Sequence, residues 1–338
     1  MTPVIPNSDP DLVVRVIAPA RLHMGFIDMG GSLGRRFGSI GVGINEIATR
    51  LSLSVASEWS AQGPDANRAV QAARRFAETT GMLEPAAIRV EEAIPGHIGL
   101  GSGTQMALAV AVGLAHLHGT NSKIGEIAAA VDRGARSGIG IAVFDQGGLI
   151  VDGGRGAKTI TPPVISRIGF PDDWRFILVL DHSGQGLHGK GETGAFEALP
   201  PFPAGETARL CHLLLLRGLP ALAEGDIQGF GDVITQLQSA VGDHFAPVQG
   251  GRFTSPEVAA AMDQLQALGA VGIGQSSWGP TGFCLVENET VADRLIGLLA
   301  PRFPGLKLLC ATARNRGAEI IVEPAPALPV QPAKALRP

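Results

Sequence analysis

The segment Pro95–Gln105 constrains the fold more than any other part of the sequence. Its letters, PGHIGLGSGTQ, place four glycines in a short loop that runs directly into an apolar stretch, Met106–His118, long enough to form a helix. Glycine allows positive φ angles and lets a ligand approach the backbone closely. A helix N-terminus behind such a loop offers unpaired N–H groups and the positive end of a dipole, which suit a phosphate. We therefore expect an anion-binding loop; a purely structural strand-to-helix turn is the alternative.

This loop matches neither of two common nucleotide-binding patterns. It lacks the GxxxxGK[ST] sequence of a P-loop, and no GxGxxG fingerprint lies between a strand and a helix there. The chain has 27 Lys and Arg against 31 Asp and Glu, a net charge of −4. Proteins that bind nucleic acid usually carry a basic excess, so we expect small molecules as partners and no nucleic acid.

The remaining composition indicates an ordinary globular protein. Hydrophobic residues make up 45% of the chain, enough to bury a sizeable core. Residues 1–11 lack the apolar run of a signal peptide, and no stretch approaches the length of a membrane span. The cysteines have no metal-ligand spacing and are expected to be reduced thiols. We expect a cytoplasmic protein with no membrane partner.

Apolar periodicity and turn residues divide the chain into alternating elements. Strands are predicted at 12–18, 46–56, 87–93, 149–151, 176–180, 281–286 and 319–323. Helices are predicted at 66–80, 106–118, 123–133, 208–225, 227–241, 256–268 and 291–300. Glycine-rich segments at 20–31, 35–43, 137–148 and 272–280 are predicted as loops. Pro162-Pro163 and Pro171-Asp172-Asp173 place a boundary there. We expect domains over 12–170 and 171–323 and a flexible tail over 324–338.

Two of these loops carry a family resemblance. Pro95–Thr104 resembles the central PxxxGLGSS-type motif of the GHMP kinases, and Gly272–Thr281, GIGQSSWGPT, resembles their third motif. The resemblance implies an α+β, GHMP-kinase-like two-domain fold. Its N-terminal domain would be a ribosomal S5 domain 2-like α/β domain, its C-terminal domain would be ferredoxin-like, and the ligand would lie between them.

A third segment disfavours kinase activity. Kinases of this family carry a segment of the form SGxDNxxxxxGG, in which the Asp acts on the substrate hydroxyl. This chain has SGIGIAVFDQGG at Ser137–Gly148, so that Asp is replaced by Gly140 and the next Asn by Ile141. Asp145 is the nearest acid, five residues along. Some kinases of the family, homoserine kinase among them, work without this Asp. An ATP-dependent small-molecule kinase and an inactive ligand-binding regulator therefore stay as alternatives.

Five segments together resemble a branch of the family that does not consist of kinases, the beta-ribofuranosylaminobenzene 5′-phosphate synthases of methanopterin biosynthesis. They are Arg21–Asp28, Gly38–Gly41, Arg136–Gly140, Gly147–Gly154 and Ser276–Thr281. The resemblance implies condensation of 5-phosphoribosyl 1-diphosphate with 4-aminobenzoate or 4-hydroxybenzoate. CO2 and pyrophosphate would be released, Mg²⁺ would assist, and the enzyme would be a homodimer.

This reaction suggests roles for several side chains. Asp28 is expected to bind Mg²⁺ or to face the ribosyl oxocarbenium carbon. His23 would bind a phosphate or act as the acid on pyrophosphate, and Arg136 would hold the benzoate carboxylate. Asp152 is expected to be a turn residue, with metal binding as the alternative. The predicted substrate- and phosphate-binding residues are Arg21, Arg35, Arg36, Ser39, His97, Gly99, Gly101, Ser102, Gly103, Thr104, Lys190, Ser276 and Ser277. Solvated arginines, a packed His23 and a loop-capping His97 are the simpler alternatives.

Overall fold

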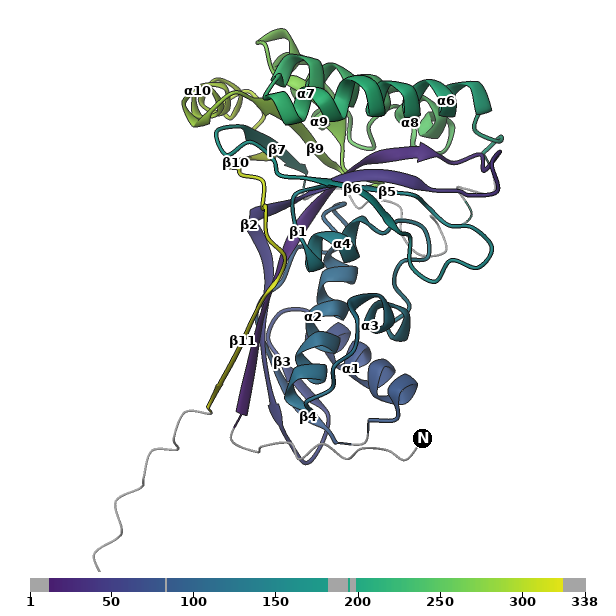
Figure 1. Ribbon diagram of the computed structural model, residues 1–338. Helices are drawn as coiled ribbons and strands as arrows, with labels where there is room; N and C mark the ends of the chain where they lie inside the picture. The colour runs from purple at the N-terminus through teal and green to yellow at the C-terminus, as the bar shows by residue number, and fades with distance from the viewer. Residues whose placement is uncertain (1–11, 83, 182–193, 195–198, 325–338) are drawn as a thin grey trace, which may run out of the picture.

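The structure is a computed structural model that describes residues 12–82, 84–181, 194 and 199–324 (Figure 1). Its strands form two separate sheets, one of seven strands and one of four. Helices cover one face of each sheet in Figure 1, and the two layered halves stack along the long axis of the molecule. The class predicted from the sequence, α+β with two domains, is confirmed.

The larger sheet contains the first strands and the last strand of the described chain. Its members are β1 (Leu12–Asp28), β2 (Gly38–Val55), β3 (Ser60–Gln62), β4 (Ala86–Glu92), β5 (Leu149–Asp152), β6 (Val164–Ile168) and β11 (Glu319–Pro324). The order is β11-β1-β2-β4-β3, and β5 pairs with both β2 and β6. Only β3 and β4 run parallel; the other pairs are antiparallel.

The smaller sheet is antiparallel throughout. It contains β7 (Arg175–Asp181), β8 (Val271–Gln275), β9 (Thr281–Val286) and β10 (Leu306–Ala311), in the order β10-β7-β9-β8. The four helices packed on the larger sheet are α1 (Ala66–Thr80), α2 (Ser102–Leu117), α3 (Ile124–Ala130) and α4 (Ile139–Asp145). The helices above are α6 (Ala204–Leu213), the π-helical turn η1 (Leu214–Gly218), α7 (Leu219–Glu224), α8 (Ile227–Gln249), α9 (Pro256–Ala267) and α10 (Glu289–Leu299).

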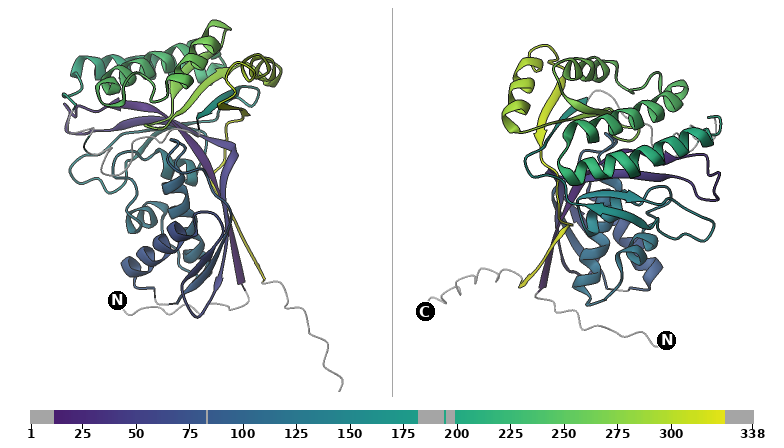
Figure 2. Two further views of the ribbon diagram at one scale, coloured as in Figure 1. Left: turned by 180° about the vertical axis from the view of Figure 1, so that it is seen from behind. Right: turned by 45° about the horizontal axis from the view of Figure 1, so that its top comes forward.

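Strand β1 contacts both halves of the molecule, and its burial pattern changes along its length accordingly. In its first part Val14, Val16 and Ala18 are buried while Arg15 is exposed, the alternation of a sheet with one open face. From Leu22 to Ile27 every residue is buried, because this part lies between α4 below and α8 above. The change coincides with register shifts against β2 between Pro19 and Gly25. Figure 2 shows the bend of the β1–β2 hairpin at this level.

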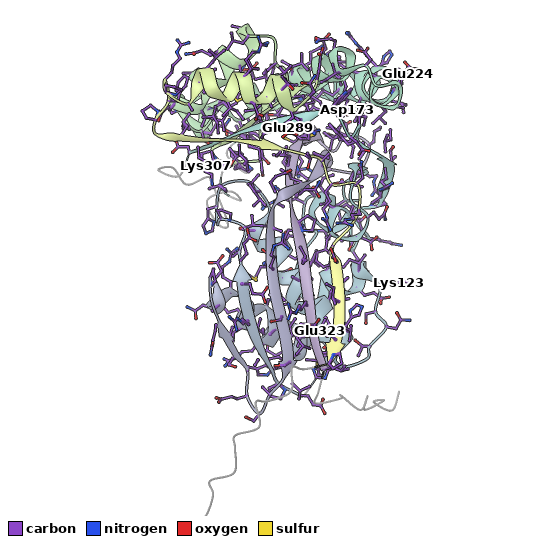
Figure 3. All side chains as sticks on the ribbon, turned by 90° about the vertical axis from the view of Figure 1, so that its left-hand side faces the viewer. Lys123, Asp173, Glu224, Glu289, Lys307 and Glu323 are labelled. Atoms are coloured by element: carbon purple, nitrogen blue, oxygen red, sulfur yellow. The ribbon has the colours of Figure 1, made fainter. Side chains whose placement is uncertain are left out.

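The open face of the larger sheet is the one turned toward the viewer in Figure 3. Glu323, labelled on β11, forms an ion pair of 2.6 Å with Arg15 on β1. This pair lies on the exposed side, where it contributes little to stability. In the described ranges, no helix has the length and apolar character needed to cross a bilayer.

All four segments predicted as glycine-rich loops are partly regular structure. Residues 20–28 continue β1, residues 38–43 begin β2, residues 139–145 form α4, and residues 272–275 belong to β8. The reason is close packing: a Cβ on Gly41 would lie 2.4 Å from Ile139 Cγ2, and one on Gly274 would lie 2.5 Å from Gln238 Cγ. Glycine here allows neighbouring elements to approach each other inside the sheet and does not break it. Strands β3, β6 and β10 were not predicted.

The last described strand pairs with the first. β11 pairs with β1, from Leu12 opposite Pro324 to Ile17 opposite Glu319, so the last strand of the predicted second domain completes the first sheet. The predicted tail begins at the last residue of β11, and its remainder, 325–338, lies outside the described residues. The boundaries at 170 and 171 remain a prediction.

Candidate functional site

A cleft of about 340 Å³ opens where the two halves of the molecule meet. β1, the N-terminus of α2, the turn after α3 and the β8–β9 turn all contribute to it. The predicted residues that line it are Arg21, His23, His97, Gly99, Gly101, Ser102, Gly103, Thr104, Arg136 and Ser277. The structure therefore brings together most of the residues that the sequence assigned to a phosphate site.

Hydrogen bonds tie the three motifs around this cleft to each other. The buried Ser276 hydroxyl accepts a bond of 3.0 Å from the His23 backbone N–H and donates one of 2.8 Å to the Gly99 carbonyl. Thr281 Oγ1 donates to the Ile98 carbonyl at 2.6 Å. Ser276 thus acts from behind the cleft and holds β1 and the central loop together.

The central loop requires glycine at position 99. Gly99 has φ +89°, and a Cβ there would lie 2.1 Å from the Ser276 carbonyl oxygen. Neither the angle nor the space suits an L side chain. His97 also has a positive φ, 62°, and its side chain is exposed at the cleft. The predicted glycine loop is therefore part of an interlocked wall as well as the entrance to α2.

The first turn of α2 faces the cleft with its positive end. Ser102, Gly103 and Thr104 line the cleft, and this turn contains no acidic residue and no side-chain cap. Gly101 supplies the N-cap in a left-handed conformation. Backbone N–H groups at such an uncapped end attract anions. The structure has the glycine-rich loop and helix N-terminus that the sequence predicted here, and anion binding at this end stays a prediction.

Four arginines line the same cleft: Arg21, Arg68, Arg133 and Arg136. Asp132 is the one carboxylate among its described lining residues. Arg133 is exposed at the cleft surface, where partial desolvation and the neighbouring charge of Arg68 lower its pKa from the ordinary value, while the charge of Asp132 acts in the opposite direction. A cluster of like charges of this kind would be stabilised by a multiply charged anion.

Sequence reasoning missed Arg68 and Arg133. A Cβ on Gly103 would lie 3.1 Å from Arg68 Nη2 and 3.9 Å from Arg133 Nη2, which places both guanidinium groups at the start of α2. Arg68 lies in the first turn of a helix predicted correctly, and Arg133 precedes Gly134 in the segment that leads to Arg136. Proximity of Arg133 to Arg136 in sequence was the available signal; nothing local distinguished Arg68.

His23 is fully enclosed at the inner end of the cleft. Among the described residues, no hydrogen-bond partner is present for either ring nitrogen, and the ring lies 4.6 Å from that of Phe26 between centroids. Burial, followed by the charges of Arg21 and Arg136, lowers the pKa of His23 from 6.5 to about 3. The imidazole is therefore neutral at neutral pH. This supports a hydrogen bond to a phosphate and disfavours the role of acid toward pyrophosphate.

Asp28 lies outside the lining of this cleft, at the end of β1. Its Oδ1 accepts bonds from the N–H groups of Gly30 at 2.8 Å and Gly31 at 3.0 Å, and from Thr207 Oγ1 at 3.2 Å. In the described part of the chain, no cluster of three or more His, Cys, Asp and Glu side chains could hold a metal ion. The described residues therefore offer no such cluster to hold a Mg²⁺ ion by themselves.

Arg35 and Arg36 bind to the protein's own backbone. Arg35 donates to the carbonyls of Gly153 at 2.9 Å and Gly154 at 2.8 Å. Arg36 donates to the Met29 carbonyl at 3.2 and 3.3 Å. Both fix the turn between β1 and β2 to its surroundings, and neither lines the cleft.

Ser39 belongs to a buried cluster around Asp152. The Asp152 carboxylate accepts bonds from Ser39 Oγ at 2.5 Å, from Ser137 Oγ at 3.2 Å, and from the N–H groups of Gly138 and Gly154 at 2.8 Å each. Burial raises the pKa of Asp152, while these four bonds act in the opposite direction. Asp152 thus stabilises the turn in which it lies and also the separate loop that follows Arg136.

No acid occupies the position of the kinase Asp. Gly140 is buried at the start of α4, where a Cβ would lie 3.0 Å from Thr104 Cγ2. Its carbonyl accepts a bond of 2.8 Å from Gln105 Nε2. Asp145, at the other end of α4, is exposed and accepts a bond from Gln146. Lys190 lies outside the described residues.

Curated relatives from archaea match nearly the whole chain. A beta-ribofuranosylphenol 5′-phosphate synthase of Methanothermobacter thermautotrophicus is 31% identical over 92% of this chain and 100% of the relative. A protein of the same name from Archaeoglobus fulgidus is 32% identical over the same shares. Residues 67–148 match the GHMP kinases N terminal domain, and residues 219–298 match the GHMP kinases C terminal family.

Solved structures share the fold at low sequence identity. Homoserine kinase from Cytophaga hutchinsonii superposes with a TM-score of 0.63 at 15% identity, over 91% of this chain and 97% of that chain. Mevalonate diphosphate decarboxylase from Staphylococcus aureus gives 0.65 at 15% identity, over 92% and 98%. These likenesses confirm the predicted two-domain fold.

Proposed function

We propose a function on the premise that the chain belongs to the beta-ribofuranosylphenol 5′-phosphate synthase family, within the GHMP kinases. The enzyme condenses 5-phosphoribosyl 1-diphosphate with 4-hydroxybenzoate or 4-aminobenzoate and releases CO2 and pyrophosphate, in methanopterin biosynthesis. The strongest structural support is the cleft: four arginines and a helix N-terminus face it, and its described lining holds one carboxylate. A donor with phosphoryl groups at both ends suits such a site.

The reaction requires three changes of bonding. The diphosphate leaves ribose C1 with the electron pair of the C–O bond, and the aromatic carbon that bears the carboxylate bonds to C1. The bond between the ring and the carboxylate carbon then breaks and CO2 departs. The electron pair of that bond restores the aromatic ring. No oxidant and no net proton are needed.

The residues of the cleft suit these steps. Arg21 and the first turn of α2 stabilise the negative charge that develops on the leaving diphosphate. Arg136 is close enough to His23 to help lower its pKa, and it binds the benzoate carboxylate until CO2 forms. Phe26 and Trp278 provide an aromatic wall beside His23, where the acceptor ring packs. Neutral His23 donates a hydrogen bond to a phosphoryl oxygen.

Magnesium enters with the donor in this proposal. Mg²⁺ commonly binds substrate phosphates and keeps several of its waters, with few protein ligands. The ion would lower the charge of the diphosphate as it leaves. Asp28 remains a candidate for contact with the hydrated ion through Oδ2, since the bonds described above involve Oδ1.

A homodimer is proposed from an exposed apolar patch. Leu215 and Leu216 in η1 are 63% and 67% exposed, which is unusual for two adjacent large apolar side chains. Light scattering of the protein and of Leu216→Glu tests this directly. We expect a dimer for the natural chain and a monomer for the variant; an unchanged mass would exclude this face as the interface.

The function is tested with donor, Mg²⁺ and each carboxyl-labelled benzoate in turn. We expect equal amounts of CO2 and pyrophosphate, with 4-hydroxybenzoate as the first acceptor to try because the relatives are named for a phenol product. Arg136→Ala should lower kcat/KM for the benzoate about 100-fold. Arg302→Ala, exposed and outside the cleft lining, is the matched control. Failure to release CO2, with ATP-dependent phosphorylation of homoserine or mevalonate, would identify a kinase instead.

A further inference from the structure

A second cavity adjoins the cleft on the side away from His23. It has a volume of about 310 Å³ and lies between α1, the start of α2 and the turn after α3. It shares Arg68, Gly103 and Arg133 with the cleft, whereas it shares no residue with the small crevice beyond His23 and Trp278. The three spaces are therefore arranged in series, and this outer pocket is at one end.

Three arginines give the outer pocket its charge. Arg68 and Arg75 lie seven residues apart on α1, two helical turns along one face, and Arg133 faces them. Arg68 pairs with Asp65 at 2.8 Å, and Arg75 pairs with Asp132 at 3.4 Å. The second pair is more than half exposed on both sides, so it is weak and easily exchanged for a ligand.

Arg133 has no such pairing. Among the described residues, none accepts a hydrogen bond or ion pair from its guanidinium. The charges of Arg68 and Arg75 act unfavourably on it, and the nearby charge of Asp132 offsets them in part. A phosphate monoester is the ligand that this geometry suits, because guanidinium groups bind its oxygens in pairs.

We propose that the outer pocket of Arg68, Arg75 and Arg133 binds the 5-phosphate of the donor, while the inner cleft binds its diphosphate. This inference rests on the proposed function. The orientation follows from the aromatic side chains. Among the described lining residues, Phe26 and Trp278 lie at the inner end, where they line both the cleft and the crevice beyond it. The acceptor ring must meet ribose C1, so C1 and its diphosphate lie at the inner end, and the phosphate at C5 reaches outward.

The two ends can be tested separately with two probes, ribose 5-phosphate and inorganic pyrophosphate, by titration calorimetry. Arg133→Ala and Arg75→Ala should each weaken ribose 5-phosphate about tenfold and change pyrophosphate affinity by less than about twofold. Arg21→Ala should show the reverse. Arg74→Ala is the matched control, because Arg74 is exposed on the same helix and lines neither cavity.

Equal weakening of both probes by Arg133→Ala, or no change with ribose 5-phosphate, would overturn the assignment, provided that thermal melting shows the variant folded. The assay for CO2 release separates this failure from that of the function. Turnover in the natural chain with an unchanged donor KM in Arg133→Ala would overturn the outer site alone. Binding of ribose 5-phosphate through Arg133 without any turnover would support the outer site and overturn the synthase.

Discussion

Two glycine-rich segments of this chain are alike in sequence and differ in the structure. In Pro95–Gln105, the loop and the first turn of α2 direct backbone N–H groups into the cleft, and arginines from other elements gather around them. In Met29–Ser39, the polar side chains bind carbonyls and a carboxylate of the same protein. The difference teaches that a glycine-rich composition indicates a ligand site only where the fold turns a helix N-terminus and side chains from other elements toward a shared cleft.

The largest effect should come from the central loop. Gly99→Ala places a Cβ against the Ser276 carbonyl at an angle that alanine disfavours, and we expect a loss of about 3 kcal/mol or more in the free energy of unfolding. Gly96→Ala is the matched control, because only the end of the Arg68 side chain lies near, at 3.5 Å. It should cost less than about 1 kcal/mol. The free energy of unfolding of both variants is measured in urea. Similar losses of this free energy would mean that the loop is not interlocked.

A second test asks whether the cleft contains an unsatisfied polar group. The pKa of His23 is about 3 in the folded chain and 6.5 when unfolded. Between these values only the unfolded chain binds the proton, so stability falls as the pH decreases. We expect His23 to account for a loss of about 2 kcal/mol between pH 7 and pH 5. His23→Gln should lack this part of the pH dependence; parallel urea-unfolding curves for the two proteins across that range would contradict it.

The Met29–Ser39 side of the comparison is tested at Asp28. Asp28→Ala removes the acceptor for two backbone N–H groups and Thr207, which should cost about 2 kcal/mol of stability. Asp28→Asn keeps an acceptor oxygen and should lose less than half as much. Melting and the CO2 assay are measured together. Full stability with lost activity in Asp28→Asn would show that the charge acts on the substrate or its metal, as the sequence suggested.

The smallest effect should come from Arg36. Arg36→Ala removes bonds to the Met29 carbonyl and a contact with the Phe37 ring, at a cost of about 1 kcal/mol. Because Arg36 is outside the cleft, kcat/KM should change by less than about threefold. If Arg36→Ala lowered kcat/KM as much as Arg136→Ala, Met29–Ser39 would have to be regarded as part of the ligand site.

Much of the fold could be predicted from the sequence. Residue periodicity gave the helix at Ala66–Thr80 with both its ends, and the motif resemblance gave the two-domain class. The errors came where glycine lies inside regular structure, as at Gly41 and Gly274. At such positions, close packing between elements that are distant in sequence determines the secondary structure. Local residue propensities contain no information about that packing.

The site was predicted less evenly. Residues of the central loop and Arg136 reach the cleft because the helix and the loop that position them follow directly in sequence. Arg35 looked equivalent to Arg136, and its backbone partners at Gly153 and Gly154 are known only from the fold. Arg68 and Arg133 enter the cleft because α1 and the turn after α3 pack beside α2, a tertiary relation that no motif contains.

The pairing of β11 with β1 has a consequence for how the protein is made. The first strand to leave the ribosome has one edge that stays open until the last described strand has been synthesised. Contacts of such long sequence separation slow folding, and an open strand edge can pair with other chains in the meantime. A fragment that stops before residue 319 should therefore aggregate during expression, although it retains every residue that lines the cleft.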